Sequence, residues 1–195
     1  MMKVRILNIW GLYADEIRTL SGRLGFRKNS LEFLAYSMEL ESGRIFDKLK
    51  GEYVENPKIL YIMLSHYAKS DPVQKVGKLI KFRDLPGGYA YEGAFTKRAV
   101  DPIAQIFGSE PSKLVEAARV LNGIEAKYGD SSVEVPALPK VPITYVLWKS
   151  NEFPASSSVL LDASASHYLP TEDIAVLGEI TTMRLKSSSD QPLVR

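Results

Sequence analysis

The sequence contains no cysteine. This absence excludes disulfide bonds, a thiol nucleophile, a cysteine-ligated zinc site and an iron–sulfur cluster ligated by this chain. Histidine is nearly as scarce: the two histidines are His66 and His167, and each stands in the tripeptide Ser-His-Tyr. Because imidazole titrates near neutral pH and binds metals, these two residues are the first candidates for acid–base or metal chemistry.

Long apolar runs and an excess of charge of one sign are also missing. No stretch approaches the roughly 20 apolar residues that a membrane helix needs. The N-terminal apolar run is too short for a signal peptide before it meets Asp15 and Glu16. The formal net charge is only +2, and the basic residues are scattered. We therefore expect a cytoplasmic protein that binds neither nucleic acid nor membranes.

Catalytic and phosphate-binding motifs are absent as well. The chain has no HExxH zinc motif, no GxSxG nucleophile elbow and no GxGxxG loop. The pair Gly87-Gly88 follows Pro86 but lacks the lysine and serine of a phosphate-binding loop, so we interpret it as a turn. The sequence therefore names no reaction.

What is present is ordinary globular composition, with 45% hydrophobic and 25% charged residues. We predict a small N-terminal subdomain over residues 1–56, a core domain over 57–185 and a disordered tail over 186–195. In the subdomain, a helix over 6–24 is expected to end at its glycines. Residues 31–40 fit a strand or a helix, and alternation of apolar side chains favours the strand.

In the core domain, segments with the hydrophobic period of a helix and segments with the period of a strand follow one another. Helices are predicted at 57–70, 96–107 with Thr96 as cap, 112–128 with Ile124 on its apolar stripe and Gly129 at its end, and 171–185 with Thr171 as cap; strands are predicted at 79–84, 133–135, 143–148 and 159–161. Runs of each type in this order predict an α+β fold, a single domain with a largely antiparallel sheet and helices packed on it.

The two histidines receive different interpretations. Ile59, Ile62, Met63 and His66 fall at helical spacing, which predicts that His66 lies on the apolar stripe of the helix over 57–70. We therefore interpret His66 as mainly structural, with a supporting role in ligand binding as the alternative.

His167 lies in the segment with the densest functional side chains. Asp162 precedes it at a strand end, and Glu172 and Asp173 follow at a helix start. These four residues are the catalytic candidates, and His167, Asp162 and Asp173 would supply nitrogen and oxygen ligands to a metal. The alternative is an ordinary turn followed by an ordinary helix cap, in which none of them has a functional role.

A second candidate region surrounds the glycine pair. Arg83 and Arg98 flank it, and with Tyr168 they are the candidates for binding an anionic ligand. The alternative is a solvated rim whose side chains only cover the surface.

Several longer motifs resemble a known family. KFRDLPGGYAYEGAFTKRAVDPIAQIFG at 81–108, LPKVPITYVLWKSNEFP at 138–154 and LLDASASHYLPTEDIAVLGEI at 160–180 are similar to those of the family catalogued as domain of unknown function 3786. The resemblance covers roughly Lys58 to Ile180, and the first fifty residues match it poorly.

The resemblance implies a setting rather than a reaction. Members occur mainly in anaerobic bacteria and archaea, and some carry an iron–sulfur label that belongs to a fused cysteine-rich domain, which this chain lacks. We therefore expect no iron–sulfur cluster on this chain, an unknown cofactor, and a role near anaerobic cofactor or one-carbon metabolism. The favoured function is a non-catalytic module that binds a small anionic ligand, a cofactor or a protein partner. The alternative is a metal-assisted enzyme that uses His167 with Asp162, Glu172 or Asp173.

Overall fold

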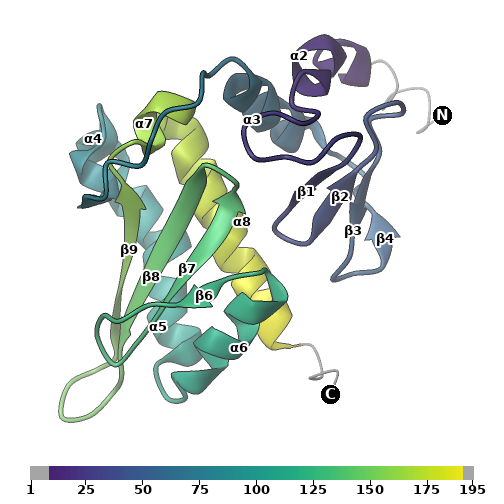
Figure 1. Cartoon of the computed structure of the whole chain (residues 1–195). Coiled ribbons are helices and arrows are strands. Elements are labelled where there is room, and N and C mark those ends of the chain that lie inside the picture. Colours follow the sequence, from purple (N-terminus) through teal and green to yellow (C-terminus); the bar gives the residue numbers. More distant parts are fainter. Residues whose placement is uncertain (1–8, 191–195) are drawn as a thin grey trace.

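Two antiparallel sheets and the helices packed on them make up the fold (Figure 1). The computed structural model describes residues 9–190. The smaller sheet has the order β1-β2-β3-β4, with β1 Leu31–Phe33, β2 Tyr36–Met38, β3 Ile45–Asp47 and β4 Glu52–Tyr53. The larger has the order β5-β9-β8-β7-β6, with β5 Leu79–Lys81, β6 Ile124–Glu125, β7 Ser131–Leu138, β8 Val141–Trp148 and β9 Ser156–Asp162. The predicted α+β class is confirmed.

The helices fall between and after the strands. They are α2 Ala14–Arg18, α3 Lys58–Ala68, α4 Gly88–Phe95, α5 Asp101–Phe107, α6 Ser112–Val120, α7 Ala165–Tyr168 and α8 Thr171–Ser189, with a 3-10 turn η1 at Phe82–Asp84 and a π-helical turn η2 at Thr96–Val100. The N-terminal helix is shorter than predicted, although residues 6–8 lie outside the described part. Residues 186–189 continue α8 instead of forming a disordered tail, and 191–195 lie outside the described residues.

The predicted strands over residues 31–40 are confirmed as the hairpin β1–β2. Leu34 and Ala35 connect them with φ of 47° and 58°, a conformation that L-residues with a Cβ adopt only at a cost. The Leu34 carbonyl accepts a hydrogen bond from Arg184 Nε of α8 at 2.9 Å. Arg184 also donates to both carboxylate oxygens of Asp47 at 2.7 Å, so this buried ion pair ties the small sheet to the core.

Helices α5 and α8 cover one face of the larger sheet, behind the strands in Figure 1. Tyr145 of β8 points to this covered face, because its hydroxyl contacts Thr182 at 3.1 Å and the Gly178 carbonyl at 3.4 Å. Since side chains alternate along a strand, Thr144 and Val146 point to the opposite face. No helix packs on that opposite face in the part of the chain between residues 9 and 190, as Figure 1 also shows.

Helix formation from residue 88 onward differs from the prediction at Thr96. The chain is helical from Gly88, so Thr96 lies inside a continuous helix and does not cap one. Pro102 explains the π-helical turn before α5, because proline has no N–H and clashes with the carbonyl one turn earlier. In the same turn, the carbonyls of Ala99 and Val100 accept hydrogen bonds from the hydroxyls of Thr182 and Ser157, each at 2.8 Å.

Three further expectations were wrong. Ile59 of α3 is 45% exposed, and Leu60 and Leu64 are buried instead, because α3 is apolar on most of its circumference and its period did not define one face. Helix α6 ends at Val120, and Asn122 with φ of 59° turns the chain into β6. Ile124 is therefore a strand residue, 65% exposed. The third expectation concerns the start of α8, where Thr171 was predicted as the cap. Pro170 precedes the helix, and the Thr171 hydroxyl donates to the Pro86 carbonyl instead of capping the helix.

Candidate ligand-binding cleft

Asp162, at the end of β9, is almost fully occupied by hydrogen bonds. Its carboxylate accepts from the Val76 N–H at 3.0 Å, the Gly77 N–H at 2.7 Å, and the N–H and hydroxyl of Ser164 at 2.9 and 2.6 Å. Burial would raise the pKa of this carboxyl, but the bonds from Ser164, Val76 and Gly77 outweigh burial and hold the pKa below 3.8. Asp162 is therefore ionised at neutral pH and fixes the backbone of residues 76 and 77.

Tyr168 and His167, on the short helix α7, hold the same segment farther upstream. The Tyr168 hydroxyl donates to the Val73 carbonyl at 2.8 Å and accepts from the Val73 N–H at 2.9 Å. His167 Nε2 donates to the Asp71 carbonyl at 2.9 Å. The Ser70 hydroxyl lies within hydrogen-bond distance of the carbonyls of His167 and Tyr168, at 3.2 and 3.0 Å.

Together these contacts fix residues 70–78, which we call the strap. The strap is mostly exposed and contains no helix or strand. Its main chain is nevertheless bonded by residues 162–168, and one of these bonds joins the Ala163 N–H to the Lys78 carbonyl at 2.9 Å. Residues 162–168, which lie within the motif at 160–180, thus hold the strap in place, and we call them the clamp. That this segment forms a site stays a prediction; in the structure its side chains bond the strap.

His66 contacts Asp173 and not His167. His66 Nδ1 donates to Asp173 Oδ2 at 2.6 Å and so joins α3 to the first turn of α8. The two Ser-His-Tyr tripeptides nevertheless lie side by side, because the rings of Tyr67 and Tyr168 are 5.7 Å apart. Among residues 9–190, the bond to Asp173 is the hydrogen bond that the His66 ring makes.

The predicted anion-binding arginines are not brought together with the other candidates. Arg83 lies 3.9 Å from the carboxylate of its neighbour Asp84, and Arg98 lies 3.6 Å from Glu179 of α8. Both guanidinium groups are half exposed or more. These contacts fit the alternative interpretation of a solvated rim.

The predicted metal ligands are distributed in the same way. Asp162 binds the strap, Asp173 binds His66, and His167 binds a main-chain carbonyl; Glu172 is exposed. Over the described range 9–190, no group of three or more histidine or acidic side chains is placed to hold a metal ion. The metal-assisted alternative stays a prediction, without a gathered set of ligands.

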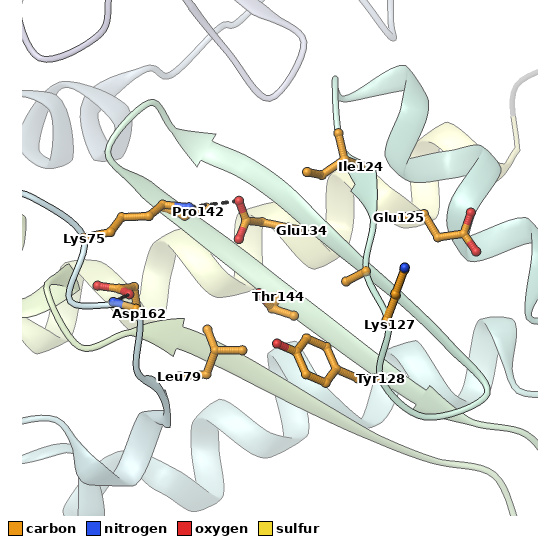
Figure 2. A pocket seen from close by; sticks show the side chains of 12 residues that line it. Lys75, Leu79, Ile124, Glu125, Lys127, Tyr128, Glu134, Pro142, Thr144 and Asp162 are labelled. Atoms are coloured by element: carbon orange, nitrogen blue, oxygen red, sulfur yellow. Dashed lines mark hydrogen bonds and ion pairs between the residues drawn. The ribbon is translucent and has the colours of Figure 1, made fainter.

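A cleft of about 400 Å³ lies on the uncovered face of the larger sheet, with the strap as one wall (Figure 2). Its lining residues are Lys75, Gly77, Leu79, Ile124, Glu125, Ala126, Lys127, Tyr128, Glu134, Pro142, Thr144 and Asp162. A volume of this size falls in the range of small-molecule sites. Because the clamp holds the strap, it also fixes the main chain that carries Lys75 and Gly77 in this wall of the cleft.

The opposite wall is the loop over residues 126–130, between β6 and β7. The Tyr128 N–H donates to the Ser132 hydroxyl at 2.8 Å, and the Asp130 N–H donates to the Leu147 carbonyl at 2.9 Å. Gly129 has a φ of +57°, and a Cβ there would lie 2.8 Å from the Leu147 carbonyl oxygen. Glycine is thus required for the loop to lie directly on β8, and it does not end a helix as we had predicted.

Thr144 provides a polar group at the floor of the cleft. The residue is only 3% exposed, it lines the cleft, and its hydroxyl has no partner among the described residues. The hydroxyl faces the cleft, where water or a ligand can bond it. In Figure 2 the ring of Tyr128, which is 50% exposed, points across the sheet towards Thr144 and Leu79.

The charges around the cleft are mostly used within the protein. Lys75 Nζ pairs with Glu134 Oε1 at 3.0 Å, the carboxylate of Asp162 is bonded by the strap, and Glu125 points away from the cleft in Figure 2. Lys127 is the ammonium at the rim that makes no ion pair with a described residue. Lys127 is therefore the group of the lining that is available to a negative charge on a ligand.

A comparison with protein families identifies what the chain is related to. The family model described as Domain of unknown function (DUF3786) matches residues 24–184. The chain belongs to this family. The DUF3786 match begins well before Lys58 and so includes the small sheet, which the motifs alone had left out. No curated protein and no solved structure matches the chain.

The DUF3786 match includes every wall of the cleft, since the strap, the loop over 126–130 and the clamp all lie inside it. Sequence reasoning missed the cleft because Tyr128 belongs to no motif and Thr144 was interpreted only as part of a strand in the motif at 138–154. One signal was available: in a strand as apolar as β8, Thr144 is polar and lies on the face opposite Tyr145.

No helix within residues 9–190 is long and apolar enough to cross a membrane.

Proposed function

We propose that the protein is a binding module whose cleft holds a small ligand with one anionic group and an apolar or aromatic body. The observation that carries this proposal is the unpartnered Thr144 hydroxyl at the floor of the cleft on the uncovered sheet face. Water can reach this hydroxyl from the cleft, and a ligand that replaces the water would gain a hydrogen bond in a partly desolvated position.

The rest of the cleft supports the same type of ligand. The Tyr128 ring and Leu79 offer an apolar surface on which a planar body can stack. Lys127 offers an ammonium for the anionic group, and the ion pair Lys75–Glu134 closes one side without adding net charge. The clamped strap would keep this geometry in the absence of ligand, which lowers the entropic cost of binding.

The role of the protein in metabolism stays an expectation. The resemblance implies a setting in anaerobic cofactor or one-carbon metabolism, and a small anionic cofactor would suit a cleft of this size and charge. Nothing in the cleft selects a reaction, since it contains no nucleophile paired with a base. We therefore favour binding over catalysis.

The experiment uses 8-anilinonaphthalene-1-sulfonate as the probe, because it combines one sulfonate with an aromatic body and becomes fluorescent when bound. The uncharged N-phenyl-1-naphthylamine serves as the matched probe without the sulfonate. We expect the sulfonate to bind more tightly to the native protein than the uncharged probe. Lys127→Gln should weaken the sulfonate about threefold to fivefold, the value of a partly exposed ion pair.

Thr144→Val tests the carrying observation, because it keeps the shape of the side chain and removes the hydroxyl. We expect it to weaken binding about fivefold, which corresponds to about 1 kcal/mol for one hydrogen bond. Lys58→Gln on the exposed face of α3 is the control and should change nothing. If Lys127→Gln and Thr144→Val bind the probe as the control does, the cleft is not the site and the proposal is wrong.

A further inference from the structure

Strand β9 has an open edge, away from the cleft. Its edge neighbour β5 pairs only with residues 160–162, through Leu79–Asp162, Ile80–Leu161 and Lys81–Leu160. After Lys81 the chain leaves the sheet and forms the 3-10 turn η1. In the structure of residues 9–190, no strand lies beside Ser156–Val159 on this side, although β8 pairs with all of them on the other.

The register determines which main-chain groups face this edge. The Ala163 N–H bonds the Lys78 carbonyl, so the odd-numbered residues of β9 direct their main-chain groups towards the β5 side. Ser157 is odd-numbered and lies beyond the end of β5, so its N–H and C=O point outward. Backbone groups in this position are a template for another strand.

A groove of about 180 Å³ runs beside the open edge. Its floor contains Phe82 and Phe95, whose rings are stacked at 4.1 Å, and Val100 of the π-helical turn. The π-helical turn is a rare element that occurs often at functional sites. Side chains of an added strand that point towards the helices would meet Phe82, Phe95 and Val100, and the same lining contains the polar side chains of Glu92 and Thr96.

The other face of an added strand would meet a different environment. Lys81 lies opposite Leu160, whose side chain is on the uncovered face of the sheet, and the Lys81 ammonium makes no ion pair with a described residue. Side chains that point to this face would therefore be favoured when they are acidic. Edge pairing, the apolar floor and Lys81 together describe one type of partner.

We infer that the edge of β9 at Ser156–Val159 binds an extended peptide in which small apolar residues alternate with acidic ones. The peptide continues the line of β5, antiparallel to β9. Its apolar side chains enter the groove over Phe82 and Phe95, and its acidic side chains lie near Lys81. This is strand addition, in which main-chain bonds give affinity and alternate side chains give specificity. It uses neither the cleft nor its ligand.

The first measurement is hydrogen exchange of the Ser157 amide in the free, full-length protein, followed by NMR. We expect it to exchange at least tenfold faster than the amide of Ser158, which is paired with β8. Slow exchange of the Ser157 amide in the free protein would overturn the proposal, because the edge would already be occupied.

The second measurement is titration with the pentapeptide acetyl-Val-Glu-Val-Glu-Val-amide. We expect binding at about 100 µM or tighter, with at least tenfold slower exchange at Ser157. Methylation of the central valine nitrogen should abolish binding, because that N–H faces Ser157. Methylation of the glutamate nitrogens, which face solvent, should change it less than threefold. Equal loss from both modifications would show non-specific sticking and contradict strand addition.

A variant pair tests the protein side. Ser157→Pro removes the outward N–H at an edge position where proline is tolerated, and it should weaken the pentapeptide at least tenfold. Ser157→Ala loses the same hydroxyl bond to Val100 and keeps the N–H, so it should bind nearly as the native protein does. If the chain dimerises, Ser157→Pro dissociates the dimer and the pentapeptide does not bind, the occupant is a second copy and our proposal is wrong.

Discussion

Asp162→Asn is the substitution that tests the clamp most severely. The asparagine oxygen can take the place of Oδ1, which accepts from Val76 and from Ser164. The amide nitrogen then stands where Oδ2 accepted the Gly77 N–H at 2.7 Å, so two donors face each other. Losing one charge-assisted bond and leaving a partly buried donor opposite another donor costs about 2 kcal/mol. We expect a loss of this size in the free energy of unfolding.

The assay is urea unfolding at neutral pH, followed by tryptophan fluorescence and fitted as a two-state transition. Glu152→Gln, an exposed carboxylate in the loop after β8, is the control and should cost less than about 0.5 kcal/mol. Amide exchange at Gly77 should also accelerate in Asp162→Asn and stay unchanged in the control. A loss in Asp162→Asn no larger than in the control would refute the clamp.

The same pair of proteins predicts a pH dependence with a definite sign. The pKa of Asp162 is below 3.8 in the folded chain, so near that pH the unfolded chain binds more protons and stability rises with pH. The contribution is complete above pH 3.8 and is lost as the pH falls through the folded pKa. The difference between native protein and Asp162→Asn should therefore shrink as the pH falls below about 4. A difference that stays constant down to pH 2 would contradict this assignment.

Three other substitutions test the remaining structural contacts. Asp47→Asn leaves Arg184 buried without a counterion and should cost about 3–5 kcal/mol in urea unfolding, and Asp47→Leu combined with Arg184→Met should recover most of it. Tyr168→Phe removes both bonds to Val73 and should cost about 1–3 kcal/mol, with faster amide exchange at Val73. Ala35→Gly relieves the positive φ and should raise the free energy of unfolding by up to about 1 kcal/mol; a loss would show that the turn is not strained.

Hydrophobic periodicity and residue type predicted several helices and strands of the core. Five of the six residues from 143 to 148 are β-branched or aromatic, and this segment forms most of β8. Residues 112–120 form the predicted helix, and Ser131–Leu138 and Ser156–Asp162 extend the strands that were predicted in part. Pro102 indicates an irregular turn before it. The position of that turn could not be predicted, because the helix begins at Gly88, eight residues before the predicted start at Thr96.

Contacts between distant segments could not be predicted in this way. The strap has no hydrophobic period, and its order comes from Asp162 and Tyr168, more than 80 residues away in the chain. His66 and Asp173 are 107 positions apart, so their pairing required the last turn of α3 to lie beside the first turn of α8. The cleft was missed for the same reason, because its walls come from three separate segments.

The most direct test of the binding cleft is an amide NMR titration of the native protein with 8-anilinonaphthalene-1-sulfonate. We predict that the largest shift changes occur at Gly77, Tyr128 and Thr144, the strap, loop and floor of the cleft. Changes centred on His167 or Arg83 instead, or spread evenly over the molecule, would contradict the proposal that this cleft is the ligand site.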